Sequence, residues 1–196
     1  YDKTKLDSRV ESRDENPAGW IHESVSFSAA YGGERELAHL FLPKNARPPY
    51  QTVVYFPGGA SPYQYSSQDI ENFYEFPMFL SFLVKNGRAA LYPVYKGTFE
   101  RASPAPISGE HARREHLIQV VKDFRRCLDY LETRQDIDNQ KTAYYGMSWG
   151  GWVGTIVLAV EERPRTGILI AGGFFEPARG YRPEVNQISY VRRVKM

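Results

Sequence analysis

The chain is poor in cysteine and lacks any long hydrophobic run. Cys127 is the one cysteine among the 196 residues, so no disulfide can form within the chain. No apolar run approaches the ~20 residues that a membrane-spanning helix needs, and the first residues lack the basic-then-apolar pattern of a secretion signal. We therefore expect no membrane partner. A reducing compartment is compatible with this cysteine usage, and we expect the cytoplasm.

The chain also has little net charge. Its 25 basic and 23 acidic residues leave a formal charge of +2, and the two signs are mixed along the sequence. Proteins that bind nucleic acid or anionic membranes usually carry a concentrated basic patch, and no such patch is visible here. The composition therefore gives no reason to propose either partner.

The chain does have enough apolar material for one sizeable core. Hydrophobic residues make up 42% of it and aromatic residues 14%, which is typical of a globular domain. No internal repeat, low-complexity tract or linker divides it. Residues 1–23 are mostly polar and predict an N-terminal extension on the surface. Residues 24–196 predict a single domain.

Strand-like and helix-like segments alternate along that domain. Residues 24–28 and 36–42 predict an antiparallel hairpin, joined across a Tyr-Gly-Gly turn. Further strands are expected at residues 51–56, 88–95, 142–145 and 167–171, and helices at residues 69–86, 110–134 and 152–160. This order predicts an α/β fold with a mostly parallel sheet and helices on both faces.

The helix expected over residues 110–134 has the clearest pattern. Its apolar residues fall at spacings of 3, 1, 3, 4 and 3 and form one stripe: Leu117, Val120, Val121, Phe124, Leu128 and Leu131. We expect Ser108 to cap its N-terminus, with Glu110 in the first turn. Gly87 is expected to end the preceding helix.

The most informative stretch is Gly-Met-Ser-Trp-Gly at residues 146–150. It follows the expected strand 142–145 and precedes an apolar helix. A G-x-S-x-G motif in this setting is typical of a nucleophile elbow, a sharp turn that lifts a serine hydroxyl above the sheet. We expect Gly146 and Gly150 to leave room that a Cβ would fill. Ser148 is therefore the candidate nucleophile.

A second glycine-rich turn, residues 57–60, follows the expected strand 51–56. Enzymes of acyl transfer with this architecture take one oxyanion N–H from the residue after the nucleophile, here Trp149. They take another from the loop after the third strand, here Gly59 or Ala60. The two turns together predict an oxyanion hole.

These motifs resemble those of the α/β-hydrolases, closest to the dienelactone-hydrolase and prolyl-oligopeptidase-like esterases. The resemblance covers residues 24–196. The chain is also similar to the hydrolase domains found C-terminal to bacterial serine/threonine kinase domains. The resemblance implies an α/β-hydrolase fold and a carboxylic-ester hydrolase that acts on a small-molecule ester. It implies no metal and no organic cofactor.

The rest of a catalytic triad is missing from the sequence. In the α/β-hydrolases the serine is followed by an acid and then by a histidine. All four histidines precede Ser148, and neither Asp nor His follows it. Glu176 stands where a minority of the family carries the acid. Residues 190–196 resemble the lead-in to a further strand, so we expect roughly 60–100 residues to follow and to supply the base.

This gap has consequences for activity and association. A serine without its base is not activated, so residues 1–196 alone are expected to be inactive. An uncovered strand 167–171 would expose backbone groups and apolar surface. We expect this edge to bind the chain's own C-terminal segment or a second copy. The alternative function is a non-catalytic interaction or regulatory domain that has lost its base, and a peptidase is not excluded.

Other residues leave more than one interpretation open. His111 and His116 suggest a metal pair, but no third ligand lies nearby in the sequence. His22 and His39 are expected to be surface or hairpin residues. An aromatic cluster either lines a pocket beside residues 57–60 or forms core beneath the first helix; it comprises Tyr63, Tyr65, Phe73, Tyr74, Phe76 and Phe79.

Overall fold

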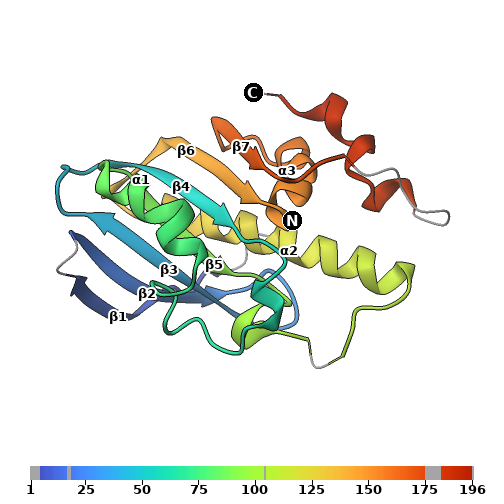
Figure 1. Cartoon of the computed structure of the whole chain (residues 1–196), viewed down its shortest axis with the longest axis horizontal. Helices are drawn as coiled ribbons and strands as arrows, with labels where there is room; N and C mark the ends of the chain where they lie inside the picture. Colours follow the sequence, from blue (N-terminus) through green and yellow to red (C-terminus); the bar gives the residue numbers. More distant parts are fainter. Residues whose placement is uncertain (1–4, 17–18, 104, 175–181, 196) are drawn as a thin grey trace.

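A mixed sheet runs through the molecule (Figure 1). The computed structural model describes residues 5–16, 19–103, 105–174 and 182–195. In this part of the chain the sheet has seven strands in the order β1-β2-β3-β5-β4-β6-β7. The strands are β1 (Arg9–Asn16), β2 (Trp20–Ser28), β3 (Arg35–Pro43), β4 (Tyr50–Phe56), β5 (Ala89–Val94), β6 (Ile137–Met147) and β7 (Thr166–Ile170). The α-helices are α1 (Ser81–Lys85), α2 (Glu110–Glu132) and α3 (Trp149–Val160).

The N-terminal half of the sheet is antiparallel. β2 and β3 form the expected hairpin, paired from Ser28 with Arg35 to Trp20 with Pro43. β1 adds a further antiparallel strand at the outer edge of β2, and β3 pairs with β5.

Part of the expected N-terminal extension belongs to this sheet. The predicted boundary after residue 23 falls inside β2, and β1 lies wholly before it. The described side chains of β1 are exposed, from Arg9 to Glu15, so the strand carries almost no apolar signal. Its position rests on backbone pairing at a sheet edge. The division into an extension and a domain over residues 24–196 stays a prediction.

The C-terminal half of the sheet is parallel. β5, β4, β6 and β7 pair side by side in one direction. Phe56 at the end of β4 pairs with Gly146 near the end of β6. The two glycine-rich turns therefore meet at the carboxyl edge of the sheet, where open α/β sheets place their ligands.

Helices cover both faces of the sheet, as expected (Figure 1). Successive residues of a strand point to opposite faces, and Val53 and Val54 of β4 show this. Val54 belongs to the core cluster that contains Phe124 of α2 and Val157 of α3. Val53 belongs to the second cluster, which contains Val84 of α1. The sheet is thus the middle layer of three.

The helix expected over residues 69–86 is wrong in its first half. Residues 69–74 form turns and a bend, Phe76–Leu80 a π-helical segment, and Ser81–Lys85 a short α-helix. Pro77 lacks an N–H, so it fits the first turn of a helix and not its interior. The helical segment therefore starts next to this proline. Gly87 follows α1 with φ of +82°, as its predicted role at the helix end requires.

Helix α2 closely matches its prediction. Its expected apolar residues are buried or half-buried. Ser108 is not its cap, because Gly109 takes the cap position with φ of +81° and no side-chain hydrogen bond. This left-handed backbone region favours glycine over serine. None of the described helices is long and apolar enough to cross a membrane.

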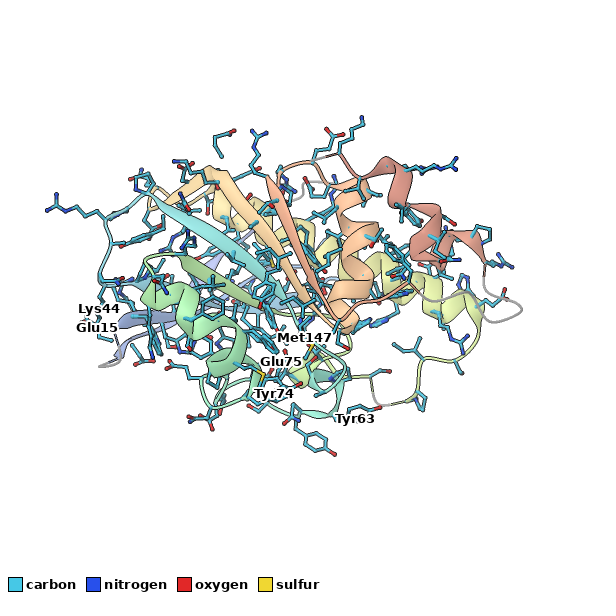
Figure 2. The ribbon with its side chains drawn as sticks, turned by 45° about the horizontal axis from the view of Figure 1, so that its top comes forward. Glu15, Lys44, Tyr63, Tyr74, Glu75 and Met147 are labelled. Carbon is cyan, nitrogen blue, oxygen red and sulfur yellow. The ribbon has the colours of Figure 1, made fainter. Side chains whose placement is uncertain are left out.

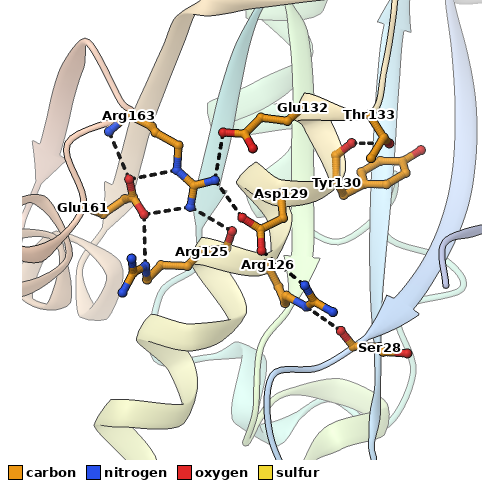
Figure 3. Close-up of polar contacts among 9 residues, drawn as sticks. All are labelled: Ser28, Arg125, Arg126, Asp129, Tyr130, Glu132, Thr133, Glu161 and Arg163. Atoms are coloured by element: carbon orange, nitrogen blue, oxygen red, sulfur yellow. Dashed lines mark hydrogen bonds and ion pairs between the residues drawn. The ribbon is translucent and has the colours of Figure 1, made fainter. Parts of the chain in front are cut away.

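A cluster of ion pairs fixes the loop between α3 and β7 to α2 (Figure 3). Arg163 lies at its centre and contacts Glu161 at 2.8 Å, Asp129 at 2.8 Å and Glu132 at 3.0 Å. Arg125 also donates to Glu161, at 3.1 Å. These contacts hold the segment that leads into β7.

β7 is the last strand of the described sheet. Its residues Ile168, Leu169 and Ile170 are 42%, 41% and 38% exposed. The chain from Pro183 to Arg193 forms short 3₁₀ turns beside α3. The apolar surface of β7 is therefore open along this edge of the described structure.

Candidate active site

Ser148 occupies a strained turn between β6 and α3. Its φ is +52° and its ψ is −103°, which a non-glycine residue adopts at a cost. Its N–H donates to the carbonyl of Ile170 at 2.7 Å, and its carbonyl accepts from the N–H of Trp152 at 2.9 Å. The backbone on both sides of Ser148 is therefore held in place.

Glycines make this turn possible, as predicted. A Cβ on Gly146 would lie 2.3 Å from the carbonyl oxygen of Gly150. A Cβ on Gly150 would lie 2.2 Å from the carbonyl oxygen of Phe56 in β4. Both contacts are with backbone atoms, so no side-chain movement relieves them. The start of α3 thus packs directly against the ends of β4 and β6.

The loop after β4 lies beside this turn. The N–H of Gly150 donates to the carbonyl of Pro57 at 3.1 Å and joins the two segments. The N–H of Gly58 donates to Glu75 Oε1 at 3.0 Å. Gly59 is exposed, and a Cβ there would have nothing within 4 Å.

Three backbone N–H groups of these two turns are available to a ligand. No described residue accepts a hydrogen bond from the N–H of Gly59, Ala60 or Trp149. Trp149 is the first residue of α3, where helical N–H groups are free and the helix dipole is positive. Such groups can stabilise a negative oxygen.

A buried carboxyl group lies behind the loop. Glu75 is fully buried and accepts four hydrogen bonds, one from Gly58 and three from the hydroxyls of Tyr55, Tyr74 and Tyr92. Figure 2 shows Glu75 and Tyr74 near Met147, the residue before Ser148. Burial raises the pKa of Glu75, although all four donors act to lower it. The sequence analysis did not select Glu75, because one glutamate in an irregular segment gives no signal.

The Ser148 hydroxyl has no hydrogen-bond partner among the described residues. None of the four histidines supplies one. His116 hydrogen-bonds the Lys96 carbonyl at 2.9 Å and stacks on the Trp149 ring, with the ring centroids 6.0 Å apart. Burial lowers the pKa of His116. His111 is exposed at the start of α2.

A second serine does contact a histidine. Ser67 Oγ lies 2.8 Å from His39 Nε2, His39 Nδ1 lies 2.9 Å from His22 Nε2, and His22 Nδ1 lies 3.0 Å from Glu71. Ser67 is only 1% exposed and His39 only 3%. Burial lowers the pKa of His39 to about 3, with a smaller contribution from His22. This series of contacts links β2 and β3 to residues 67–71. Because Ser67 is buried, substrate cannot reach it.

The remaining candidates divide between core and surface. Phe76 is buried, and Phe73 and Phe79 pack against the core on the α1 face, whereas Tyr63 and Tyr65 are 81% and 94% exposed. No group of three or more His, Cys, Asp or Glu residues in the described ranges could hold a metal ion. Glu176 lies outside the described residues.

A hollow of about 200 Å³ lies beside Trp149. Its walls come from the first turns of α2 and α3 and from two flanking segments: Ile107, Arg113, His116, Leu117, Val120, Trp149, Trp152 and Val185. The lining is apolar and aromatic, with a guanidinium and an imidazole. Such a mixture suits an organic group that carries a few polar atoms.

No family model and no curated protein matches the sequence. The structure, however, is similar to solved esterases. An acetyl xylan esterase from Paenibacillus sp. R4 has a TM-score of 0.64 and 21% identity, over 97% of this chain and 63% of that one. A glucuronoyl esterase from Solibacter usitatus has a TM-score of 0.62 and 15% identity, over 86% of this chain and 52% of that one.

A protein from Klebsiella pneumoniae assigned as a dienelactone hydrolase is also similar, with a TM-score of 0.55 and 17% identity. It is matched over 79% of this chain and 62% of its own. These similarities show the α/β-hydrolase fold that the two motifs predicted. The chain spans between 52% and 63% of the length of these three structures.

Proposed function

We propose that the protein is a serine hydrolase that acts on carboxylic esters, with Ser148 as its nucleophile. The observation that carries this proposal is the position of Ser148. It has a positive φ at the carboxyl edge of the sheet, beside backbone N–H groups that no described residue accepts. The esterase names of the similar structures support the class of reaction.

The proposed reaction has two halves. The Ser148 oxygen attacks the ester carbonyl while a general base takes the hydroxyl proton. The N–H groups of Trp149 and of Gly59 or Ala60 stabilise the oxyanion. The leaving alcohol receives the proton from the base, and an acyl-enzyme remains. Water then attacks the acyl group with the same base, which releases the carboxylic acid and restores the serine.

The base and its acid are proposed to come from residues beyond Met196. This fits the 52% to 63% coverage of the similar esterases and the absence of a described partner for the Ser148 hydroxyl. The same segment, or a second copy of the chain, is proposed to cover the exposed apolar residues of β7.

The substrate is proposed to be a small-molecule ester. The hollow beside Trp149 offers about 200 Å³ for an acyl or alcohol group, and its aromatic walls would pack against an apolar or sugar ring.

A second candidate function is a non-catalytic interaction or regulatory domain. The observation that favours it is the same unpartnered Ser148 hydroxyl, since a serine without a base is not activated. The two functions differ in whether the full-length protein turns over an ester.

Hydrolysis of p-nitrophenyl acetate by the full-length protein tests the proposal. We expect Ser148→Ala to lower kcat by about 10³-fold or more, and Ser67→Ala, the matched buried-serine control, to leave it within about twofold. Equal activity of wild type and Ser148→Ala would refute the nucleophile. No activity in the folded wild type on a panel of short-chain and aryl esters would favour the regulatory domain.

A further inference from the structure

Side chains hydrogen-bond both the N–H and the carbonyl oxygen of Gly58. Its N–H donates to Glu75 Oε1 at 3.0 Å, and its carbonyl oxygen accepts from the Ser61 hydroxyl at 2.9 Å and from the Ser61 N–H at a longer 3.4 Å. Both partners are fully buried. The two side-chain bonds together fix the peptide planes before and after Gly58.

The second of these planes contains the N–H of Gly59. In a trans peptide the C=O and the N–H point in opposite directions. Because Ser61 holds the Gly58 carbonyl oxygen, the Gly59 N–H must point away from Ser61. A rotation of this plane would exchange the donor for an acceptor, and a carbonyl oxygen repels an oxyanion.

Glu75 connects this loop to the centre of the sheet. Its Oε2 accepts from the hydroxyls of Tyr55 in β4 and Tyr92 in β5, at 3.1 and 3.0 Å. Both tyrosines belong to strands of the sheet and are fully buried. Glu75 therefore links the N–H of Gly58 through hydrogen bonds to two strands of the sheet.

A direct chemical role for Glu75 does not fit these contacts. Four donors surround its two oxygens, and within the described part of the chain no hydrogen bond joins it to Ser148. Its bond to Gly58 also removes that N–H from the set available to an oxyanion. The loop donor for the oxyanion is thus the N–H of Gly59 or of Ala60.

We propose that Glu75 and Ser61 are positioning residues that aim the Gly59 N–H at the oxyanion formed on Ser148. This inference rests on the proposed function. It adds two residues that contact neither substrate nor nucleophile, and it predicts effects on the transition state and not on substrate binding.

Ser61→Ala is the sharpest test, because it removes one hydroxyl and changes no charge. In the full-length protein we expect kcat for p-nitrophenyl acetate to fall about tenfold or more, with KM within about twofold. The inhibition constant of a trifluoromethyl ketone, whose hemiketal oxyanion occupies the same hole, should rise by a similar factor. Ser67→Ala, which also removes a buried hydroxyl, should change neither quantity.

Glu75 gives the second test through side-chain length. Glu75→Gln keeps an acceptor at the same distance from Gly58, whereas Glu75→Asp withdraws it by one methylene. We expect kcat to decrease in the order wild type, Gln, Asp, with melting temperatures recorded for each variant. If the Asp variant does not fold, Ser61→Ala decides alone.

The outcomes separate this inference from the function on which it rests. Ester hydrolysis that does not depend on Ser148 removes the proposed function. Hydrolysis that depends on Ser148, with unchanged kcat and inhibition constant in Ser61→Ala, overturns only the positioning role. A loss of melting temperature in Ser61→Ala without a loss of kcat also overturns it, because it assigns a structural role alone.

Discussion

Two serines of this molecule invite comparison, because each has part of what a catalytic serine needs. Ser67 has a histidine at 2.8 Å, but the pair is buried. Ser148 has no described side-chain partner, but it stands at a strained turn with free backbone N–H groups beside it. A serine–histidine contact alone therefore does not identify an active site. Access and the surrounding backbone are what support the proposal for Ser148.

The two regions also differ in what they stabilise. The Ser67 region joins the side chains of Ser67, His39 and His22 and links β2 and β3 to the irregular segment before α1. The Ser148 region places backbone atoms of β4, β6 and α3 in close contact through glycine. We expect mutations in the first region to affect stability alone, and mutations in the second to affect stability, the turn and catalysis.

The largest expected effect on stability is at Gly150. Gly150→Ala puts a Cβ 2.2 Å from the Phe56 carbonyl oxygen. Alanine is the better helix former by about 1 kcal/mol, but the clash should outweigh this and cost about 3 kcal/mol or more in unfolding free energy.

Gly59→Ala is the control, because its Cβ would meet open space. Urea unfolding of both variants measures the difference. A Gly150→Ala protein as stable as Gly59→Ala would show that the turn is not as tightly packed as described.

The next effect is catalytic. Gly59→Val adds bulk where the loop is open, so the fold should survive. The side chain should crowd the oxyanion and lower kcat by about 10²-fold, equivalent to roughly 2.7 kcal/mol. Steady-state kinetics of the full-length protein, with the melting temperature as a check on folding, measures it. An unchanged kcat in a folded variant would remove this loop from the site.

The Ser67 region should respond to pH through His39. Its folded pKa of about 3 lies below the usual value of 6.5. A histidine with a depressed pKa contributes stability above its unfolded pKa, and this stability is lost as the pH falls toward the folded pKa. Between pH 7 and pH 5 the loss from one such histidine is about 2 kcal/mol.

Unfolding free energies of wild type and His39→Gln at these two pH values measure the contribution. The variant should lose less stability on acidification. Parallel losses in the two proteins would show that His39 is not buried in its neutral form.

The smallest effect is expected at a surface ion pair. Glu15 of β1 contacts Lys44 at 3.2 Å, and its side chain is 72% exposed (Figure 2). Glu15→Gln should change the unfolding free energy by less than about 0.5 kcal/mol, since exposed pairs contribute little. The change in unfolding free energy of this variant serves as the reference for the change expected at His39. A cost above about 1 kcal/mol would mean that β1 is held more strongly than its exposure indicates.

Features with a periodic apolar pattern or a glycine-rich turn could be predicted from the sequence. The pattern of apolar segments predicted the parallel strands and α2. The two glycine-rich turns predicted that the candidate active site lies at the carboxyl edge of the sheet. The helix expected over residues 69–86 was wrong in its first half, because Pro77 limits where a helix can begin. Ser67 with His39, and Glu75 with Gly58, could not be found, because each pair is brought together by packing across 28 and 17 residues.

The central claim is that Ser148, and not Ser67, is the reactive serine. Reaction of the full-length protein with a fluorophosphonate, followed by mass spectrometry of its peptides, tests this directly. The account predicts one adduct on the peptide that contains Ser148, lost in Ser148→Ala and retained in Ser67→Ala. An adduct that persists in Ser148→Ala, or that maps to Ser67, would contradict it.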